Sequence, residues 1–421
     1  VTTIEAEAFT DCAYMTNVVI GDGVDSIGQT AFQRCIRLAT VTVGSSYTGP
    51  IALVLPARES ITIASGNPAY RSTVEGMVLS KDGTRYEMCP IAWTGNYVIP
   101  DGVTTIGEWS FAQVRGLAGI TIPDSVAALG SGAFQNCSGL TNVVIPNGVT
   151  ELPTSLFSGC QALSRVTIPS SVTIIGVGAF GACQYLTEVP LPGALEEIGS
   201  GAFVNCTALS ELSIPATVTS IGLQAFLNCS SLAVFTVEAG NPSFRTIDGA
   251  LFDHALTTLI ALPGAFDGHY VIPDGVTSLE EGAMRSHPSV TGLTIPGSMK
   301  VIGPLAFRRC PRLQTLILEE GVERLESFSF AECTSLKSVE MPDSLVSLGD
   351  QSFSKCSSLT DINFGSGLTT MGSHVFVRCS ALQEIVIPAS LTSIGSNTFH
   401  FCMNLSEVVL EKGLSALGDG M

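Results

Sequence analysis

The sequence predicts a solenoid of short stacked coils, and three observations indicate this fold. Phenylalanine recurs in steps of 23 residues, and a cysteine follows most of these phenylalanines three positions later. One clean copy of the repeat, residues 202–222, reads AFVNCTALSELSIPATVTSIG. Apolar residues make up 45% of the chain and charged residues only 13%. A single coil cannot bury such an apolar face by itself, so successive coils are expected to stack.

Each position of the clean copy has a physical interpretation. Leu209, Leu212 and Ile214 follow the L-x-x-L-x-L spacing, which places them on the inner side of a short strand and its approach. Pro215 ends the strand because it has no N–H to donate to a ladder. Gly222 suits a corner that needs positive φ or a close approach of two backbones. The Ala-Phe-x-x-Cys segment that follows is expected to form one helical or 3₁₀ turn.

The repeat has a recognisable consensus of Ile-Pro, then Val-x-x-Ile-Gly, then Ala-Phe-x-x-Cys-x-x-Leu. It reads IPDSVAALGSGAFQNCSGL at 122–140 and IPASLTSIGSNTFHFCMNL at 387–405. These motifs resemble the BspA-like leucine-rich repeats, known also from treponemal and trichomonad surface proteins, and they cover essentially the whole chain. The resemblance implies a right-handed leucine-rich-repeat solenoid of the α/β-horseshoe class. One face would carry a parallel β-sheet, and the other short helical or 3₁₀ turns and irregular coil.

The 23-residue rhythm breaks twice, and both breaks contain a similar segment beginning Gly-Asn-Pro and ending Val-Ile-Pro-Asp-Gly-Val-Thr. Asp82-Gly83 in the first segment is a hairpin signal. We expect two β-hairpin insertions that project near 76–90 and 249–263. The predicted organisation is a single solenoid over 1–421, with N-terminal coils at 1–65, hairpin-bearing segments at 66–110 and 240–283, six coils at 111–239, and six coils plus a truncated end at 284–421.

Charge and hydropathy exclude several classes of function. The net charge of −18 disfavours nucleic acids and anionic membrane surfaces as partners. No run of 18 apolar residues occurs, so direct membrane insertion is not predicted. The chain starts and stops partway through a repeat and opens on Val1 without a signal peptide. A signal and an anchor are therefore expected outside it.

Twelve of the thirteen cysteines belong to the repeat, and only Cys89 does not. A stack of disulfides is one interpretation. Parallel Cβ vectors about 4.8 Å apart exceed the ~3.8 Å that a disulfide prefers, which favours buried, reduced thiols. No zinc-ligand spacing occurs, and Gly176–Gly181 matches GxGxxG only within the ordinary repeat. The five histidines lie in expected surface loops or at variable repeat positions, so no catalytic residue, metal or cofactor is predicted.

Two sets of residues are candidates for partner binding. Outward strand positions carry a row of carboxylates that would attract a basic partner. The alternative is a solvated acidic face that keeps the solenoid soluble. Aromatic residues cluster in the two hairpin-bearing segments, where they form either a contact site or local packing of the hairpin. The candidates are Glu188, Glu211, Asp361, Glu384 and Glu407 in the row, and Trp93, Tyr97, Phe266 and Tyr270 in the segments.

The resemblance implies a secreted or cell-surface, non-enzymatic protein that binds or adheres to another protein, such as a host matrix or cell-surface protein. We expect a monomer. The alternative is a structural spacer stalk that presents another domain. An enzyme would require a deep pocket with convergent polar groups.

Overall fold

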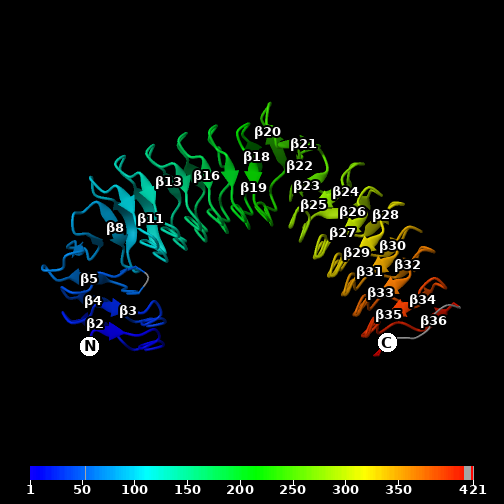
Figure 1. Cartoon of the computed structure of the whole chain (residues 1–421), viewed down its shortest axis with the longest axis horizontal. Helices are drawn as coiled ribbons and strands as arrows, with labels where there is room; N and C mark the ends of the chain where they lie inside the picture. The colour runs from blue at the N-terminus through cyan, green and yellow to red at the C-terminus, as the bar shows by residue number, and fades with distance from the viewer. Residues whose placement is uncertain (53, 412–418, 421) are drawn as a thin grey trace. The chain divides into compact units, whose positions relative to one another are not determined.

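The computed structural model describes residues 1–52, 54–411 and 419–420, in which every regular element is a β-strand (Figure 1). The chain forms two compact units. Unit 1 comprises Val1–Leu209 and Ser213–Ala225, and unit 2 comprises Ser210–Leu212 and Phe226–Met421. Each unit therefore holds one of the two inserted segments and a run of regular coils.

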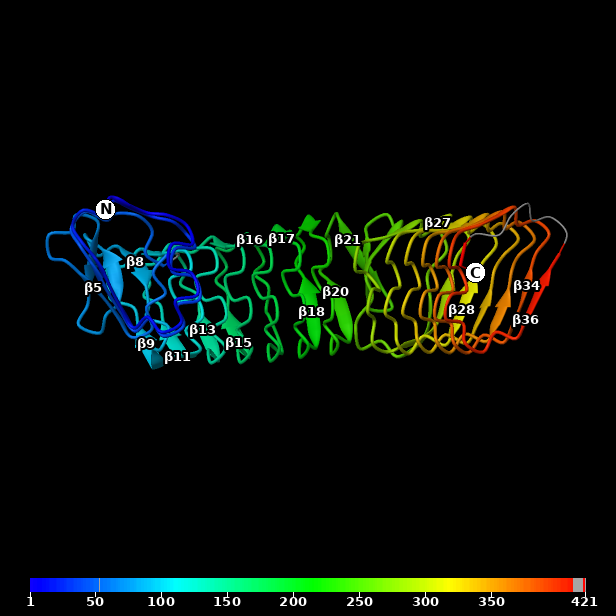
Figure 2. The ribbon, with the colours of Figure 1, turned by 90° about the horizontal axis from the view of Figure 1, so that it is seen from below.

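Most regular coils contribute one longer strand, and these strands pair in parallel with the strand of a neighbouring coil, as the pairs β13–β15 and β26–β28 show. The coil that contains Glu188 has no such strand. In β18 and β28 the inward residues are buried and the outward ones exposed, because side chains alternate between the two faces of a strand. Figure 2 shows several of these strands, such as β28, β34 and β36 in unit 2. In unit 1 they are β2 (Asn17–Ile20), β4 (Thr40–Val43), β5 (Ser60–Ile63), β9 (Thr94–Val98), β11 (Gly116–Thr121), β13 (Asn142–Val144) and β15 (Arg165–Thr167). In unit 2 they are β20 (Val234–Val237), β24 (Gly268–Val271), β26 (Val290–Ile295), β28 (Thr315–Leu318), β30 (Ser338–Glu340), β32 (Asp361–Asn363), β34 (Glu384–Ile387) and β36 (Glu407–Leu410), and β18 (Glu211–Ile214) lies where the units divide.

The Val-x-x-Ile-Gly part of the repeat forms a second parallel ladder of two-residue strands, as between β14 and β16. In unit 1 these strands are β1 (Thr3–Ile4), β3 (Ser26–Ile27), β10 (Thr105–Ile106), β12 (Ala128–Leu129), β14 (Glu151–Leu152), β16 (Ile174–Ile175), β17 (Glu197–Ile198) and β19 (Ser220–Ile221). In unit 2 they are β25 (Ser278–Leu279), β27 (Val301–Ile302), β29 (Arg324–Leu325), β31 (Ser347–Leu348), β33 (Thr370–Met371) and β35 (Ser393–Ile394).

Both insertions contain the expected hairpin, but the hairpins do not project as predicted. In unit 1, β6 (Tyr70–Ser72), β7 (Val78–Ser80) and β8 (Arg85–Met88) form an antiparallel meander, and β8 then pairs in parallel with β10. In unit 2, β21 (Phe244–Ile247), β22 (Ala250–Asp253) and β23 (Thr258–Ala261) repeat this arrangement against β25. Leu79 and Phe252 are buried in the hairpin strands, so the apolar residues of the meander join the core instead of extending into solvent.

The repeat phenylalanines form a column of stacked rings within each unit. In unit 1 the rings of Phe134 and Phe157 lie 5.5 Å apart with planes 9° from parallel, and in unit 2 those of Phe330 and Phe353 lie 5.5 Å apart at 7°. Both spacings are within the range of offset-stacked aromatic pairs. The column that the 23-residue step predicts is therefore present in both units.

The corners that carry these phenylalanines contain no helical or 3₁₀ turn in the described residues, so that detail of the predicted fold is wrong. In a regular corner the amides of Gly132, Phe134 and Asn136 donate to carbonyls of the next coil at 2.9, 3.0 and 2.7 Å. Gly132 and Asn136 also have φ of +61° and +59°. A helix needs its amides for bonds within its own chain segment and a right-handed φ throughout. Bonding between coils therefore replaces the helical turn.

Candidate functional site

Three outward acidic positions of unit 2 lie on β32, β34 and β36, the longer strands of its last three coils with a described strand. Asp361, Glu384 and Glu407 each begin their strand and are exposed. Glu384 is directly opposite Glu407 in the parallel pair β34–β36. Paired strands lie about 4.8 Å apart, so the carboxylates of Glu384 and Glu407 repel each other and favour a cation between them. These three exposed carboxylates are called the anionic strip.

The other two acidic candidates do not belong to this strip. Glu211 begins β18 and is exposed. Glu188 is exposed as well but lies outside any strand, because Pro190, two residues later, cannot donate an N–H to the ladder. Both remain candidates only as separate surface charges.

The aromatic candidates of unit 1 pack against the insertion. Trp93 and Tyr97 are half-buried, with ring centroids 5.4 Å apart in an edge-on arrangement. Tyr97 also lies 5.7 Å from Tyr86 and 5.9 Å from Phe111. Tyr86 is fully buried and stacks on Phe111 at 4.6 Å, so it continues the phenylalanine column from within the insertion. These contacts agree with the interpretation of local packing.

The aromatic candidates of unit 2 are more deeply placed. Tyr270 is only 6% exposed and belongs to the main core of the unit, and burial raises the pKa of its hydroxyl. Phe266 is half-buried and meets Tyr270 edge-on at 5.3 Å. Tyr270 thus offers almost no surface to a partner, and its burial was not evident from the sequence.

The repeat cysteines are free thiols with a defined structural task. The thiol of Cys160 donates to the carbonyl of Phe134 in the preceding coil at 3.0 Å, and Cys356 does the same to Phe330 at 3.3 Å. Burial raises the pKa of the Cys356 thiol to about 12. Because the thiolate is the reactive form, such a cysteine is inert and acts as a small hydrophobic group with one donor.

We expect most of the thirteen thiols to react with Ellman's reagent only after denaturation. At pH 8, a thiol of pKa about 12 is a thiolate about once in ten thousand molecules. Cys12 and Cys402 are half-buried and should react first. Absorbance at the thionitrobenzoate band, with and without guanidinium, measures both populations, and a Cys402→Ala variant should lose part of the early phase. Full reaction in the native state, or a denatured chain that lacks free thiols without reductant, would contradict the prediction.

His287 occupies the cysteine position in the degenerate coil after the second insertion. It is buried, with Nε2 2.9 Å from the carbonyl oxygen of Pro263, and Nδ1 accepts the N–H of Val290 at 3.2 Å. Burial lowers its pKa, which keeps the imidazole neutral. The expectation that every histidine lies in a surface loop or at a variable repeat position is therefore wrong for His287, whose imidazole takes the place of the thiol donor.

A charged cluster on the corners of unit 2 was not predicted from the sequence. Glu332 receives hydrogen bonds from Arg309 Nε at 2.8 Å and Arg308 Nε at 3.2 Å, and Lys355 Nζ lies 3.8 Å away. Burial opposes ionisation of Glu332, but the two arginines outweigh it and hold its pKa at about 2. These partners lie one coil apart, so only a comparison of charges at the repeat interval would have revealed them.

The described residues contain no group of three or more metal-ligating side chains. None of the described segments forms a helix with the length and hydropathy of a membrane span.

Comparison with known proteins agrees with the geometry. A model of the BspA type leucine rich repeat region (6 copies) matches residues 1–49, 94–180, 153–267, 268–344 and 301–421. No curated protein matches the chain. A leucine-rich repeat protein from Eubacterium ventriosum is similar in structure with a TM-score of 0.59 and 21% identity, covering 77% of this chain and 92% of that one. One from Bacteroides ovatus has a TM-score of 0.55 and 25% identity, covering 80% and 92%.

The family model spans well over half of the chain, and both solved relatives share the fold. The chain belongs to the BspA-type leucine-rich repeat family.

Proposed function

We propose that this chain is a non-enzymatic binding protein that engages a basic protein partner at the cell surface or outside the cell. Leucine-rich repeat proteins generally act as protein-binding scaffolds, which supports the coarse assignment. A surface location follows the resemblance to bacterial surface proteins. The observation that carries the proposal is the anionic strip, in which Asp361, Glu384 and Glu407 are exposed on the longer strands of three successive coils.

The strip has the properties of a recognition surface for cations. Glu384 and Glu407 project from paired strands, so a partner does not have to order the backbone that carries them. Apart from Thr360, whose hydroxyl donates to Asp361 at 2.6 Å, no side chain among the described residues forms a hydrogen bond or ion pair with the three acids. Val386 lies beside Glu384 on the same face and is 49% exposed, which adds an apolar contact. Lysine or arginine side chains of a partner would complement both features.

The test neutralises the strip and compares it with an equal change of charge elsewhere. We expect the triple variant Asp361→Asn, Glu384→Gln, Glu407→Gln to weaken binding of a fluorescein-labelled lysine-rich peptide about tenfold or more at low salt, as loss of three charge contacts predicts. The control triple variant is Asp101→Asn, Asp274→Asn, Glu319→Gln, whose side chains are exposed and lie off the strip. Its affinity should stay within about twofold, because only long-range attraction changes.

Fluorescence anisotropy at two salt concentrations gives both affinities, and the same variants should then be compared for binding to purified matrix proteins. Equal weakening by the two triple variants would reduce the effect to net charge and overturn the strip as a site. A structural spacer predicts that the unmodified chain retains neither the peptide nor any matrix protein.

A further inference from the structure

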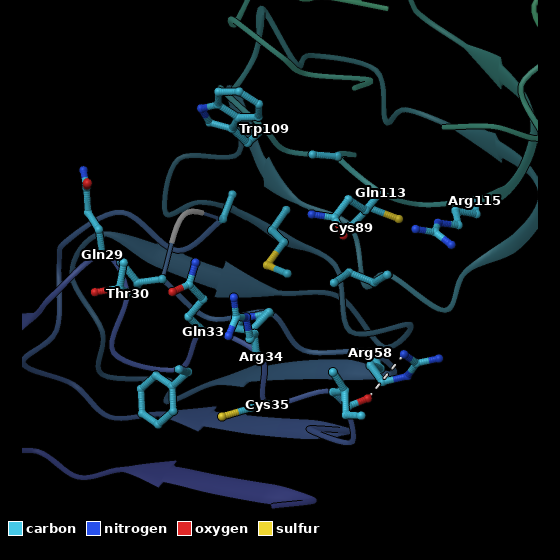
Figure 3. A pocket seen from close by; sticks show the side chains of 18 residues that line it. Gln29, Thr30, Gln33, Arg34, Cys35, Arg58, Cys89, Trp109, Gln113 and Arg115 are labelled. Atoms are coloured by element: carbon cyan, nitrogen blue, oxygen red, sulfur yellow. Dashed lines mark hydrogen bonds between the residues drawn. The ribbon is translucent and has the colours of Figure 1, made fainter. Parts of the chain in front are cut away.

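Unit 1 contains a cleft of about 740 Å³ beside the first insertion (Figure 3). One wall is the corner that includes Gln29 to Ile36, and the facing wall is formed by Trp109 to Arg115. Met88 and Cys89 from the insertion line it as well. Its volume falls within the range of ligand-binding sites in proteins. The family model does not match residues 50–93, so the cleft lies where the regular repeat is interrupted.

The cleft lies where the hydrogen bonds between the corners of successive coils stop. In the first coil, the amides of Phe9 and Asp11 donate to carbonyls of the second coil at 2.8 and 2.9 Å. The corresponding amides of that second coil belong to Thr30, Phe32 and Arg34. None of these three has a hydrogen-bond acceptor among the described residues. The segment that follows does not carry the Ala-Phe corner that would supply the carbonyls.

Three arginines line the cleft, and no acidic residue does so among the described residues. Arg34 pairs with Asp11 at 3.5 Å, but both side chains are well exposed, so the pair holds Arg34 weakly. Arg58 donates to the carbonyl of Ile36 at 3.4 Å. Arg115 has no ion-pair partner among the described residues. The chain has only 19 basic residues against 37 acidic ones, so a cleft with three arginines and no carboxylate is locally cationic.

We propose that this cleft binds an acidic peptide segment of a partner, as a site separate from the anionic strip. The peptide carbonyls accept hydrogen bonds from the amides of Thr30, Phe32 and Arg34, as the carbonyls of a following coil would. Its Asp or Glu side chains pair with Arg58 and Arg115, whose guanidinium groups suit carboxylates. In a regular corner such amides donate to the carbonyls of alternate residues in the next coil, at Thr154, Leu156 and Ser158, so one peptide segment can reach all three amides.

The experiment measures binding of a fluorescein-labelled octapeptide of alternating Glu and Ala to the full chain by anisotropy. We expect Arg58→Gln combined with Arg115→Gln to weaken binding about tenfold or more, as loss of two charge-assisted contacts predicts. The matched control combines Arg165→Gln and Arg324→Gln, two exposed strand arginines outside the cleft. It has the same charge change and should alter affinity by less than about twofold.

Hydrogen exchange distinguishes a peptide site from a simple anion site. Bound peptide should slow exchange of the amides at Thr30, Phe32 and Arg34, which have no acceptor among the described residues of the unbound chain. Phosphate, sulfate or acetate should neither protect these amides nor displace the peptide at equal concentration. Displacement by a small anion without protection would overturn the peptide as occupant. Equal weakening by the two double variants, or no binding at all, would overturn the site. Neither result affects the test of the anionic strip, which uses other residues and a basic probe.

Discussion

Replacing Gly349 by alanine is expected to destabilise unit 2 by about 3 kcal/mol, whereas the same replacement at Gly303 should stabilise it by about 0.5 kcal/mol. The two glycines occupy the same position of the repeat, directly after the two-residue strands β31 and β27. A Cβ at Gly349 would lie 2.6 Å from the carbonyl carbon of Glu326 and 2.7 Å from the amide nitrogen of Ser327. A Cβ at Gly303 would meet no heavy atom within 4 Å.

The difference arises from the preceding coil. The neighbours of Gly349 are backbone atoms of a regular coil, which cannot yield without disturbing the ladder between β29 and β31. The coil before Gly303 is the degenerate one and leaves this position open. At an open position, alanine restricts the unfolded chain and therefore stabilises the fold. Guanidinium unfolding followed by circular dichroism measures both changes. Two shifts of the same sign would show that close coil approach does not require glycine here.

The columns of the fold could be predicted because they depend on one residue type at one interval. The phenylalanine step places Phe134 and Phe157 in stacking contact, and the cysteine step places Cys160 beside the preceding coil. Gly222 was expected to need either positive φ or a close backbone approach. It shows the second, since a Cβ there would lie 2.4 Å from the amide nitrogen of Ser200.

The corners could not be predicted because two kinds of hydrogen bond compete for the same amides. Ala-Phe-x-x-Cys suits a helical turn locally, but the bond from Phe134 to the next coil exists only after stacking. The same limit applies to the insertions and to the cleft. Tyr86 enters the phenylalanine column from a hairpin strand, and Tyr270 enters the core, through contacts that no local pattern encodes. Of the candidate site, the sequence could predict which carboxylates point outward but not which aromatic residues remain accessible.

Truncation of Phe330 to alanine is expected to lower the free energy of unfolding by about 4 kcal/mol. Phe364→Ala is the matched comparison and should have a smaller effect. The Phe330 ring is fully buried and stacks on Phe307 at 5.0 Å and on Phe353 at 5.5 Å. Its removal leaves a cavity and breaks two ring contacts. Phe364 is half-buried outside the column, and its ring centroid lies 6.1 Å from that of Phe376 in an edge-on arrangement. Its truncation should cost about 1–2 kcal/mol, because a partly exposed ring leaves a smaller cavity.

Because each coil contacts only its neighbours, the loss at Phe330 should also be local. Hydrogen exchange should accelerate most in the corners on either side of Phe330, where the amides of Phe307 and Phe330 donate to carbonyls of the next coil at 2.8 Å each. Coils of unit 1 should keep their exchange rates and serve as the internal reference. Equal losses of stability for Phe330→Ala and Phe364→Ala would mean that the column contributes no more than ordinary apolar burial. A loss confined to the Phe330 corners, together with a lower unfolding midpoint, would show that the column contributes to the contact between neighbouring coils, beside the hydrogen bonds that also join them.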